Sequence, residues 1–278
     1  MTGKWPLGSE VRRKVVAGGA MLYDASRAGN LSPEAFDPVL LARRGQIVGE
    51  AHGRGTAWFL AVQNRAWVLR HFRRGGLVSR LSRDRYFWQG EEHTRPFAEW
   101  QLTYHLHRAG LPVPAPIAAR YRKLGLSYCG DIITERLPDV WSLGQALEAA
   151  PLSLLTWIAI GRCLRRFHAL GVCHADLNAH NILLGQYVES IEAPVDRVYL
   201  IDFDRGSLRK PGFWKDANLV RLRRSLEKIT WGMPPERFTE DDWHGLLDGY
   251  QQLPAAQAGP AAAGEPRRTP APSVLPTG

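Results

Sequence analysis

The pattern of apolar residues changes near Pro138, and this change limits the folds that the chain can adopt. Before Pro138 the apolar residues form short runs rich in Val, Ile, Phe and Trp, which are typical of β-strands. After Pro138 they recur at helical spacing over longer stretches. A strand-rich half followed by a helix-rich half predicts an α+β protein with two lobes. We expect a β-rich lobe over residues 1–137, a helical lobe over 138–253, and a disordered Ala/Pro-rich tail over 254–278.

Individual segments can be assigned within this plan. In the first half, residues 46–72 contain an early strand and a β-hairpin whose turn lies at Gln63-Asn64-Arg65. A helix is expected over residues 95–110, which begin near a proline and end at a glycine, with strands following near Ile117 and over 128–137. The second half is predicted to contain helices over 141–149, 153–170, 214–229 and 239–252, and short strands around 182–184 and 198–201.

The charge of the chain favours anionic partners. It carries 36 Lys and Arg against 27 Asp and Glu, a net charge of +9, and arginine supplies nearly all of the excess. Such a surplus suits nucleotides, phosphorylated substrates or an acidic bilayer face without choosing among them. The three cysteines are odd in number and lack metal-ligand spacing, which indicates buried thiols in a reducing compartment.

Neither a secretory signal nor a membrane span is predicted. Residues 12–22 resemble a signal peptide only faintly, because their apolar run is short and broken by glycines. The best apolar stretch, residues 152–161, is about half of the roughly 20 residues that a spanning helix needs. The chain is therefore expected to lie in the cytoplasm.

The polar run HADLNAHNILL at residues 174–184 contains the first chemical motif. Asp176 is followed five positions later by Asn181, the D-x-x-x-x-N spacing of a kinase catalytic loop, and His174 occupies the first position of H-x-D. In such a loop a carboxylate orients the attacking hydroxyl, and an amide oxygen holds the Mg²⁺ on the nucleotide phosphates. A polar loop before a strand accounts for the same residues, since Asp and Asn are common in loops.

A second motif lies at the end of the strand VYLIDFD. Asp202-Phe203 matches the D-F of D-F-G, where a second metal-binding carboxylate is expected. The alternative is an acidic turn closed by Asp204-Arg205-Gly206. Because the two motifs occur in the right order after a long apolar helix, together they favour phosphoryl transfer.

The first half supplies candidate nucleotide contacts. Gly53 and Gly55 lie between two predicted strands, where a phosphate-covering loop would lie, although a plain hairpin turn also needs glycine. Glu99 on the predicted helix could hold a cation from the strand WVLRHF. That cation is normally Lys, but no lysine occurs between Lys14 and Lys123, so Arg70 must take the role. A solvated strand arginine is the alternative.

Together HADLNAHNILL, IDFDRG and VLRHFRRGG resemble the 3-deoxy-D-manno-octulosonic acid (Kdo) kinases of lipopolysaccharide assembly, over roughly residues 45–230. The resemblance implies a two-lobed protein-kinase-like fold and transfer of the γ-phosphate of ATP to a hydroxyl of Kdo on a lipid A precursor. It implies a peripheral location on the cytoplasmic face of the inner membrane.

The same resemblance implies a role for each matching residue. Asp176 would be the catalytic base, and Asn181 and Asp202 the Mg²⁺ ligands. Arg70 would contact phosphate with Glu99 as its partner, and Gly53 and Gly55 would cover the ATP. His174 is interpreted as structural, packing the loop against Phe203.

Departures from the protein-kinase pattern narrow the function. Ala175 replaces the arginine of H-R-D, and Asp204 replaces the glycine of D-F-G, which argues against a phosphorylation-regulated protein kinase. Asn178 replaces the lysine expected two residues after the base, so the transferred phosphate must find positive charge elsewhere. Arg205 is one candidate.

The arginine-rich stretch at residues 69–88 alternates with Leu77, Leu81, Tyr86, Phe87 and Trp88, and suits an anionic glycolipid or membrane surface. A solvated basic loop explains it equally well, and no nucleic-acid motif accompanies it, so no nucleic-acid partner is expected. Two other functions stay open: a small-molecule phosphotransferase of the aminoglycoside or choline kinase type, and a catalytically silent kinase-like binding protein.

Overall fold

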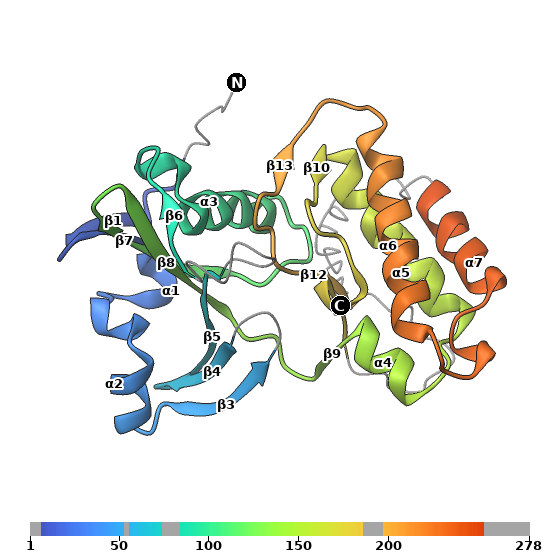
Figure 1. The fold of residues 1–278 in the computed structure, drawn as a ribbon, viewed down its shortest axis with the longest axis horizontal. Coiled ribbons are helices and arrows are strands. Elements are labelled where there is room, and N and C mark those ends of the chain that lie inside the picture. Colours follow the sequence, from blue (N-terminus) through green and yellow to red (C-terminus); the bar gives the residue numbers. More distant parts are fainter. Residues whose placement is uncertain (1–6, 53–55, 74–83, 186–196, 253–278) are drawn as a thin grey trace, which may run out of the picture.

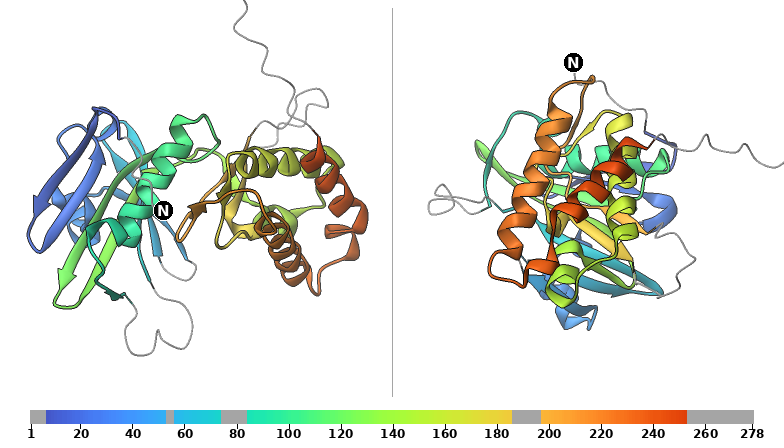
Figure 2. Two further views of the ribbon diagram at one scale, coloured as in Figure 1. Left: turned by 90° about the horizontal axis from the view of Figure 1, so that it is seen from above. Right: turned by 90° about the vertical axis from the view of Figure 1, so that its right-hand side faces the viewer.

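A computed structural model describes residues 7–52, 56–73, 84–185 and 197–252 of the chain. It has a strand-rich lobe and a helical lobe, which lie side by side in Figure 1 and in the left view of Figure 2. The predicted tail at 254–278 lies outside the described residues.

One antiparallel sheet forms the framework of the first lobe. Its strands are β1 (Val11–Val16), β2 (Gly19–Asp24), β3 (Ile47–His52), β4 (Thr56–Val62), β5 (Arg65–His71), β6 (Tyr86–Phe87), β7 (Pro116–Leu124) and β8 (Ser127–Glu135). They follow the order β1-β2-β7-β8-β5-β4-β3, with β6 paired to β8. The predicted hairpin is β4-β5, in which Val62 pairs with Arg65. This order places β5, which carries Arg70, inside the sheet between β4 and β8.

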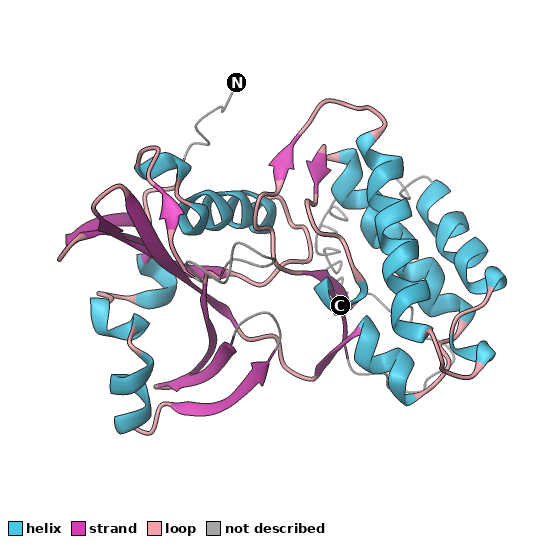
Figure 3. Cartoon of the chain, in the orientation of Figure 1, coloured by secondary structure: helices cyan, strands magenta, loops and turns pink. Residues whose placement is uncertain are grey.

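Both faces of this sheet are covered by helices (Figure 3). Side chains alternate between the faces along each strand, so Ile132 joins one core and Ile133 the other. Helix α3 (Arg95–Arg108) packs on the first face through Phe97 and Trp100. The second face is covered by α1 (Ala25–Ala28), the 3₁₀ turn η1 (Pro33–Phe36) and α2 (Pro38–Arg43).

The segment before residue 46 was not assigned to strands or helices from the sequence. Residues 12–22, which resemble a signal peptide only faintly, lie within the β1-β2 hairpin, and Gly18 in its turn has a φ of 75°. A positive φ costs glycine little, and the tight turn allows β2 to pair with β7. The apolar run thus belongs to the folded lobe.

Four helices and five short strands make up the described part of the second lobe. The helices are α4 (Leu143–Ala149), α5 (Leu154–Ala169), α6 (Trp214–Thr230) and α7 (Glu240–Gln251). The strands are β9 (Val140–Ser142), β10 (Val172–Cys173), β11 (Ile182–Gly185), β12 (Val198–Leu200) and β13 (Ser207–Leu208). Two 3₁₀ turns, η4 (Ala179–Asn181) and η5 (Pro235–Arg237), complete it. The helices that were predicted in this half are present.

One helix boundary differs from its prediction. The helix expected from Trp141 begins instead at Leu143, because Trp141 and Ser142 pair with β11 as part of β9. Ser142 then caps the helix, and its hydroxyl accepts a hydrogen bond from the Gln145 backbone N–H. Local propensity favours helix here, but pairing with a strand from later in the chain decides the structure.

Helices α5 and α7 of the second lobe approach each other closely. A Cβ atom at Gly161 would meet the carbonyl oxygen of Leu246, and one at Gly249 would meet that of Ile158. Only glycine permits this backbone contact. None of the helices in the described residues is long and apolar enough to cross a membrane.

Candidate active site

Arg70 and Glu99 form a partly buried ion pair in the first lobe. Arg70 Nη2 donates to both carboxylate oxygens of Glu99, at 2.6 and 2.7 Å, and Glu99 is only 5% exposed. Strand β5 supplies the arginine and α3 supplies the carboxylate, so the pair ties the helix to the sheet. The pairing predicted from the sequence is confirmed, although its role in nucleotide binding stays a prediction.

The same arginine reaches the second lobe. Arg70 Nη1 lies 3.2 Å from Asp202 Oδ1, so two nitrogens of one guanidinium contact carboxylates from different lobes. Burial acts to raise the pKa of Glu99, and the Arg70 guanidinium beside it acts to lower that pKa. Burial also acts to lower the pKa of Arg70, but Glu99 and Asp202 together raise it above its ordinary value. Arg70 is therefore a fixed positive charge between the lobes.

His174 supports the loop that carries Asp176. Its Nε2–H donates to the carbonyl oxygen of Ile201 at 2.9 Å, while its Nδ1 accepts from the Asp176 backbone N–H at 3.2 Å. Burial lowers its pKa, which agrees with a neutral ring in this arrangement. The ring centroid lies 5.0 Å from that of Phe203, so the predicted contact between these two residues is present.

Two asparagines hold the backbone beside Asp176. The Nδ2 atoms of Asn178 and Asn181 each donate to the carbonyl oxygen of Asp176 at 2.9 Å, and this oxygen can accept both bonds. The Asp176 side chain is about one third exposed. Asn178 had no assigned role from the sequence. Its contact shows that the residue replacing the expected lysine shapes the loop.

Asn181 and Asp202 lie close together across two strand ends. The Ile201 backbone N–H donates to the carbonyl oxygen of Asn181 at 3.0 Å, which places Asp202 next to that residue. Because the Asn181 amide nitrogen is engaged by Asp176, its side-chain oxygen is the atom left for another ligand. Asp202 Oδ1 is buried and accepts no hydrogen bond from the described residues, although it faces Arg70.

These two oxygen donors fit a Mg²⁺ ion bound together with nucleotide phosphates. Within the described residues, no three His, Cys, Asp or Glu side chains gather closely enough to hold a metal alone. Mg²⁺ does not require such a cluster, because it commonly binds one or two protein oxygens and completes its shell with phosphates and water. The residues are therefore compatible with the metal that the sequence predicts.

Asp204 forms a second link between the lobes that the sequence did not predict. Its Oδ2 accepts a hydrogen bond from Arg95 Nη1 at 3.0 Å, and Arg95 lies at the start of α3. The arginine also stacks over Tyr86, 4.3 Å from the ring centroid. Two links thus attach helix α3 to the loop after β12. Arg95 binds Asp204, and Glu99 binds Arg70, which in turn contacts Asp202.

Part of the predicted site lies outside the described residues. Gly53 and Gly55 belong to the undescribed segment between β3 and β4, which pair up to His52 and Thr56. Their role over the nucleotide remains a prediction. The basic stretch at residues 74–83 is also outside the described part.

The described aromatic residues of that stretch only partly fit a membrane-facing surface. Tyr86 is buried in the core of the first lobe, and Trp88 packs against Tyr121 with ring centroids 5.1 Å apart. For Tyr86 the expectation of a membrane-facing position is wrong, because the pairing of β6 with β8 directs it inward, whereas Trp88 is only partly buried. Phe87 is exposed.

Helix α6 supports the catalytic loop through polar residues that the sequence analysis did not identify. Asn218 accepts from the His174 backbone N–H and donates to the His174 carbonyl oxygen, while Ser225 Oγ accepts from the Ala179 N–H. Arg221, between them on the helix, lies 3.7 Å from Asp176. The signal was present as polar residues at i, i+3 and i+7 of a helix that also has an apolar face.

The chain has a strand-rich lobe and a helical lobe. An arginine between two carboxylates links the lobes, and the second lobe carries an Asp-bearing loop. These features define a protein-kinase-like fold. The fold is similar to the solved structure titled "WaaP in complex with acyl carrier protein", with a TM-score of 0.53 and 20% identity. That likeness covers 83% of this chain and 86% of the other. The likeness defines the fold class of this chain as protein-kinase-like.

The family is shown by sequence. The model of the lipopolysaccharide kinase (Kdo/WaaP) family matches residues 39–250, and the chain belongs to this family. Relatives named 3-deoxy-D-manno-octulosonic acid kinase occur in several organisms. The one from Actinobacillus succinogenes is 45% identical over 78% of this chain and 89% of the relative, and the one from Haemophilus influenzae is 41% identical over 83% of this chain and 95% of the relative. The one from Xylella fastidiosa is 44% identical over 76% of this chain and 81% of the relative.

Proposed function

We propose that the protein is a Kdo kinase that transfers the γ-phosphate of ATP to a hydroxyl of Kdo on a lipid A precursor. The observation that carries the proposal is the 40–45% identity to Kdo kinases over most of their length. The contacts that connect the site residues support it: Arg70 contacts Asp202, Ile201 next to Asp202 binds the Asn181 backbone, and the Asn181 side chain binds the Asp176 backbone.

In this proposal each side chain has a defined task. Asp176 accepts the proton of the attacking hydroxyl as the new O–P bond forms and the bond to ADP breaks. Asn181 and Asp202 hold Mg²⁺, which neutralises phosphate charge when bound. Arg70 contributes a fixed positive charge toward the phosphates, oriented by Glu99. Gly53 and Gly55 allow the backbone to approach the nucleotide.

We further propose that the enzyme works at the cytoplasmic face of the inner membrane as a peripheral protein. Phe87, Leu124 and Leu126 are exposed at the end of the first lobe, and Lys123 lies beside them. Exposed apolar side chains near cations suit an anionic bilayer surface, where each cation contributes on the order of 1 kcal/mol. A glycolipid acceptor would be presented there.

The test is a transfer assay with labelled ATP, Mg²⁺ and a Kdo-bearing lipid A precursor, run in parallel with aminoglycosides and choline as acceptors. Label on the Kdo lipid, absent without Mg²⁺, is the expected result. Label on an aminoglycoside or choline alone would refute the Kdo assignment. ATP binding without transfer to any acceptor would instead indicate a silent kinase-like protein.

A further inference from the structure

Arg221 holds a positive charge beside the residue that is proposed to activate the acceptor hydroxyl. Its Nη1 lies 3.7 Å from Asp176 Oδ1. The position is set by α6, whose residues Asn218 and Ser225 bind the backbone of the catalytic loop on either side of Asp176. The guanidinium therefore stays near the acceptor side of the site as long as the helix holds the loop.

This charge is available to a ligand. The Arg221 side chain is 55% exposed and that of Asp176 is 35% exposed. An ion pair this accessible to water contributes little to stability and is readily exchanged for another anion. Arg70, by contrast, is 28% exposed and is engaged by both Glu99 and Asp202.

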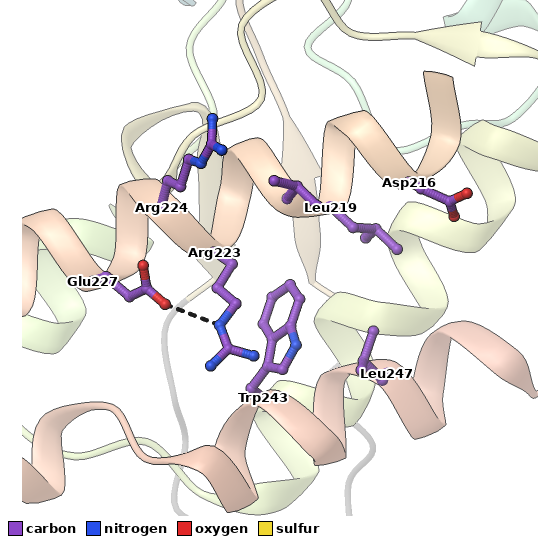
Figure 4. A pocket seen from close by; sticks show the side chains of 8 residues that line it. Asp216, Leu219, Arg223, Arg224, Glu227, Trp243 and Leu247 are labelled. Carbon is purple, nitrogen blue, oxygen red and sulfur yellow. Dashed lines mark hydrogen bonds and ion pairs between the residues drawn. The ribbon is translucent and has the colours of Figure 1, made fainter. Parts of the chain in front are cut away.

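The neighbouring arginines of α6 face elsewhere. Arg223 binds Glu227 and Glu240, and stacks over Trp243 in a groove of about 430 Å³ between α6 and α7. Arg224 lines the same groove (Figure 4). Of these three arginines, Arg221 is the one with an ion pair to the catalytic loop.

We propose that Arg221 binds the carboxylate of the acceptor sugar and holds its hydroxyl next to Asp176. The inference rests on the proposed function, since Kdo is an acid whose carboxylate would otherwise be repelled by Asp176. A guanidinium presents parallel N–H donors that match a carboxylate, so it both offsets the repulsion and fixes the orientation of the sugar. It would also favour acidic over neutral sugars as acceptors.

The test pairs a change in the enzyme with a change in the substrate. Wild type and Arg221→Gln are assayed with a Kdo-bearing acceptor as the free acid and as its methyl ester, which is uncharged. We expect wild type to prefer the acid by about 10- to 100-fold in kcat/KM. Arg221→Gln should lose this preference, with a raised KM for the acid and an unchanged KM for ATP. Arg221→Lys should restore part of it.

Arg224→Gln is the matched control, because it removes the same charge from the same helix without touching the loop, and it should retain the preference of wild type. Circular dichroism and thermal unfolding establish that each variant folds. A full preference for the acid in folded Arg221→Gln would overturn the proposal. So would a raised KM for ATP with an unchanged acceptor KM, which would place Arg221 on the phosphate. If wild type transfers nothing to Kdo, the proposed function itself fails.

Discussion

Arg70 contacts carboxylates of both lobes with different nitrogens of one guanidinium: Nη2 lies 2.6 Å from Glu99 Oε1, and Nη1 lies 3.2 Å from Asp202 Oδ1. A lysine has a single charged nitrogen and could not contact two such separated carboxylates in the same way. The arginine found where kinases usually have lysine is therefore matched to its surroundings. Lysine, the usual kinase residue, is therefore not better suited to this position than arginine.

Arg70→Lys should weaken the use of ATP. We expect kcat/KM for ATP to fall by about 10- to 100-fold, because one of two charge-assisted contacts is lost. Steady-state kinetics with varied ATP and saturating acceptor measure this effect. Arg65→Lys, an exposed change on the same strand, is the control. Equal or higher activity of Arg70→Lys would contradict the importance of the forked contact.

Asp176→Ala should abolish most phosphoryl transfer while the protein still binds nucleotide. A positioned base typically contributes about 10²- to 10⁴-fold to the rate, and Asp176 is proposed to act on the acceptor hydroxyl. The rate is followed with labelled ATP, and binding by calorimetry with ADP and Mg²⁺. Asp241→Ala, on the exposed first turn of α7, should behave as wild type. Unchanged turnover of Asp176→Ala would remove this residue from the mechanism.

Arg95→Gln should loosen the attachment of α3 to the second lobe. Burial raises the pKa of Asp204 and Arg95 opposes this effect, so removing the arginine leaves a largely buried carboxylate without its partner. We expect the free energy of unfolding to fall by about 1–3 kcal/mol, and the KM for ATP to rise because α3 also carries Glu99.

The control for Arg95→Gln is Arg44→Gln, which breaks a half-exposed pair with Glu34. Such a pair contributes less than about 1 kcal/mol. Urea unfolding compares the two variants with wild type. Similarly small losses in the free energy of unfolding for both variants would show that the link between Arg95 and Asp204 does not hold the helix.

His168 should make the protein less stable in mild acid. Burial lowers its pKa from 6.5 to about 4. Between these values the unfolded chain binds a proton that the folded protein does not, so the free energy of unfolding decreases as the pH falls. His168 alone should account for a loss of about 2 kcal/mol between about pH 7 and pH 5.

Urea unfolding of wild type and His168→Gln at both pH values measures this contribution. The variant should show a correspondingly smaller loss, although His174, whose pKa burial also lowers, keeps some dependence. Identical pH profiles for the two proteins would mean that His168 does not titrate between the folded and unfolded states.

Gly161→Ala should separate α5 from α7 and destabilise the second lobe. Alanine is favoured over glycine in a helix by about 1 kcal/mol, but the added methyl would meet the carbonyl oxygen of Leu246. Overpacking of this kind typically costs about 1–3 kcal/mol, and it should outweigh the gain in helix propensity. Gly212→Ala, whose added Cβ would have Trp214 at an ordinary 3.6 Å, should have little effect on thermal unfolding. A more stable Gly161→Ala protein would contradict the observed helix contact.

Much of this protein could be predicted from patterns that are local in the chain. The period of apolar residues identified the helices, and the spacing of Asp176, Asn181 and Asp202 identified a kinase-like loop, because these signals depend on near neighbours. The absence of lysine between Lys14 and Lys123, together with Glu99 on the following helix, was enough to propose the pairing of Arg70 with Glu99. The β1-β2 hairpin was missed, since its short strands lack a distinctive pattern and are stabilised by pairing with β7.

Only the tertiary structure revealed contacts between residues that are distant in sequence. Trp141 lies in a strand because β11 pairs with it, and Tyr86 turns inward because β6 pairs with β8. Arg221 and Asp176 meet only because α6 packs beneath the catalytic loop. The sequence determines which side chains are available, whereas long-range packing determines which of them face one another, because a contact depends on distance in space rather than along the chain.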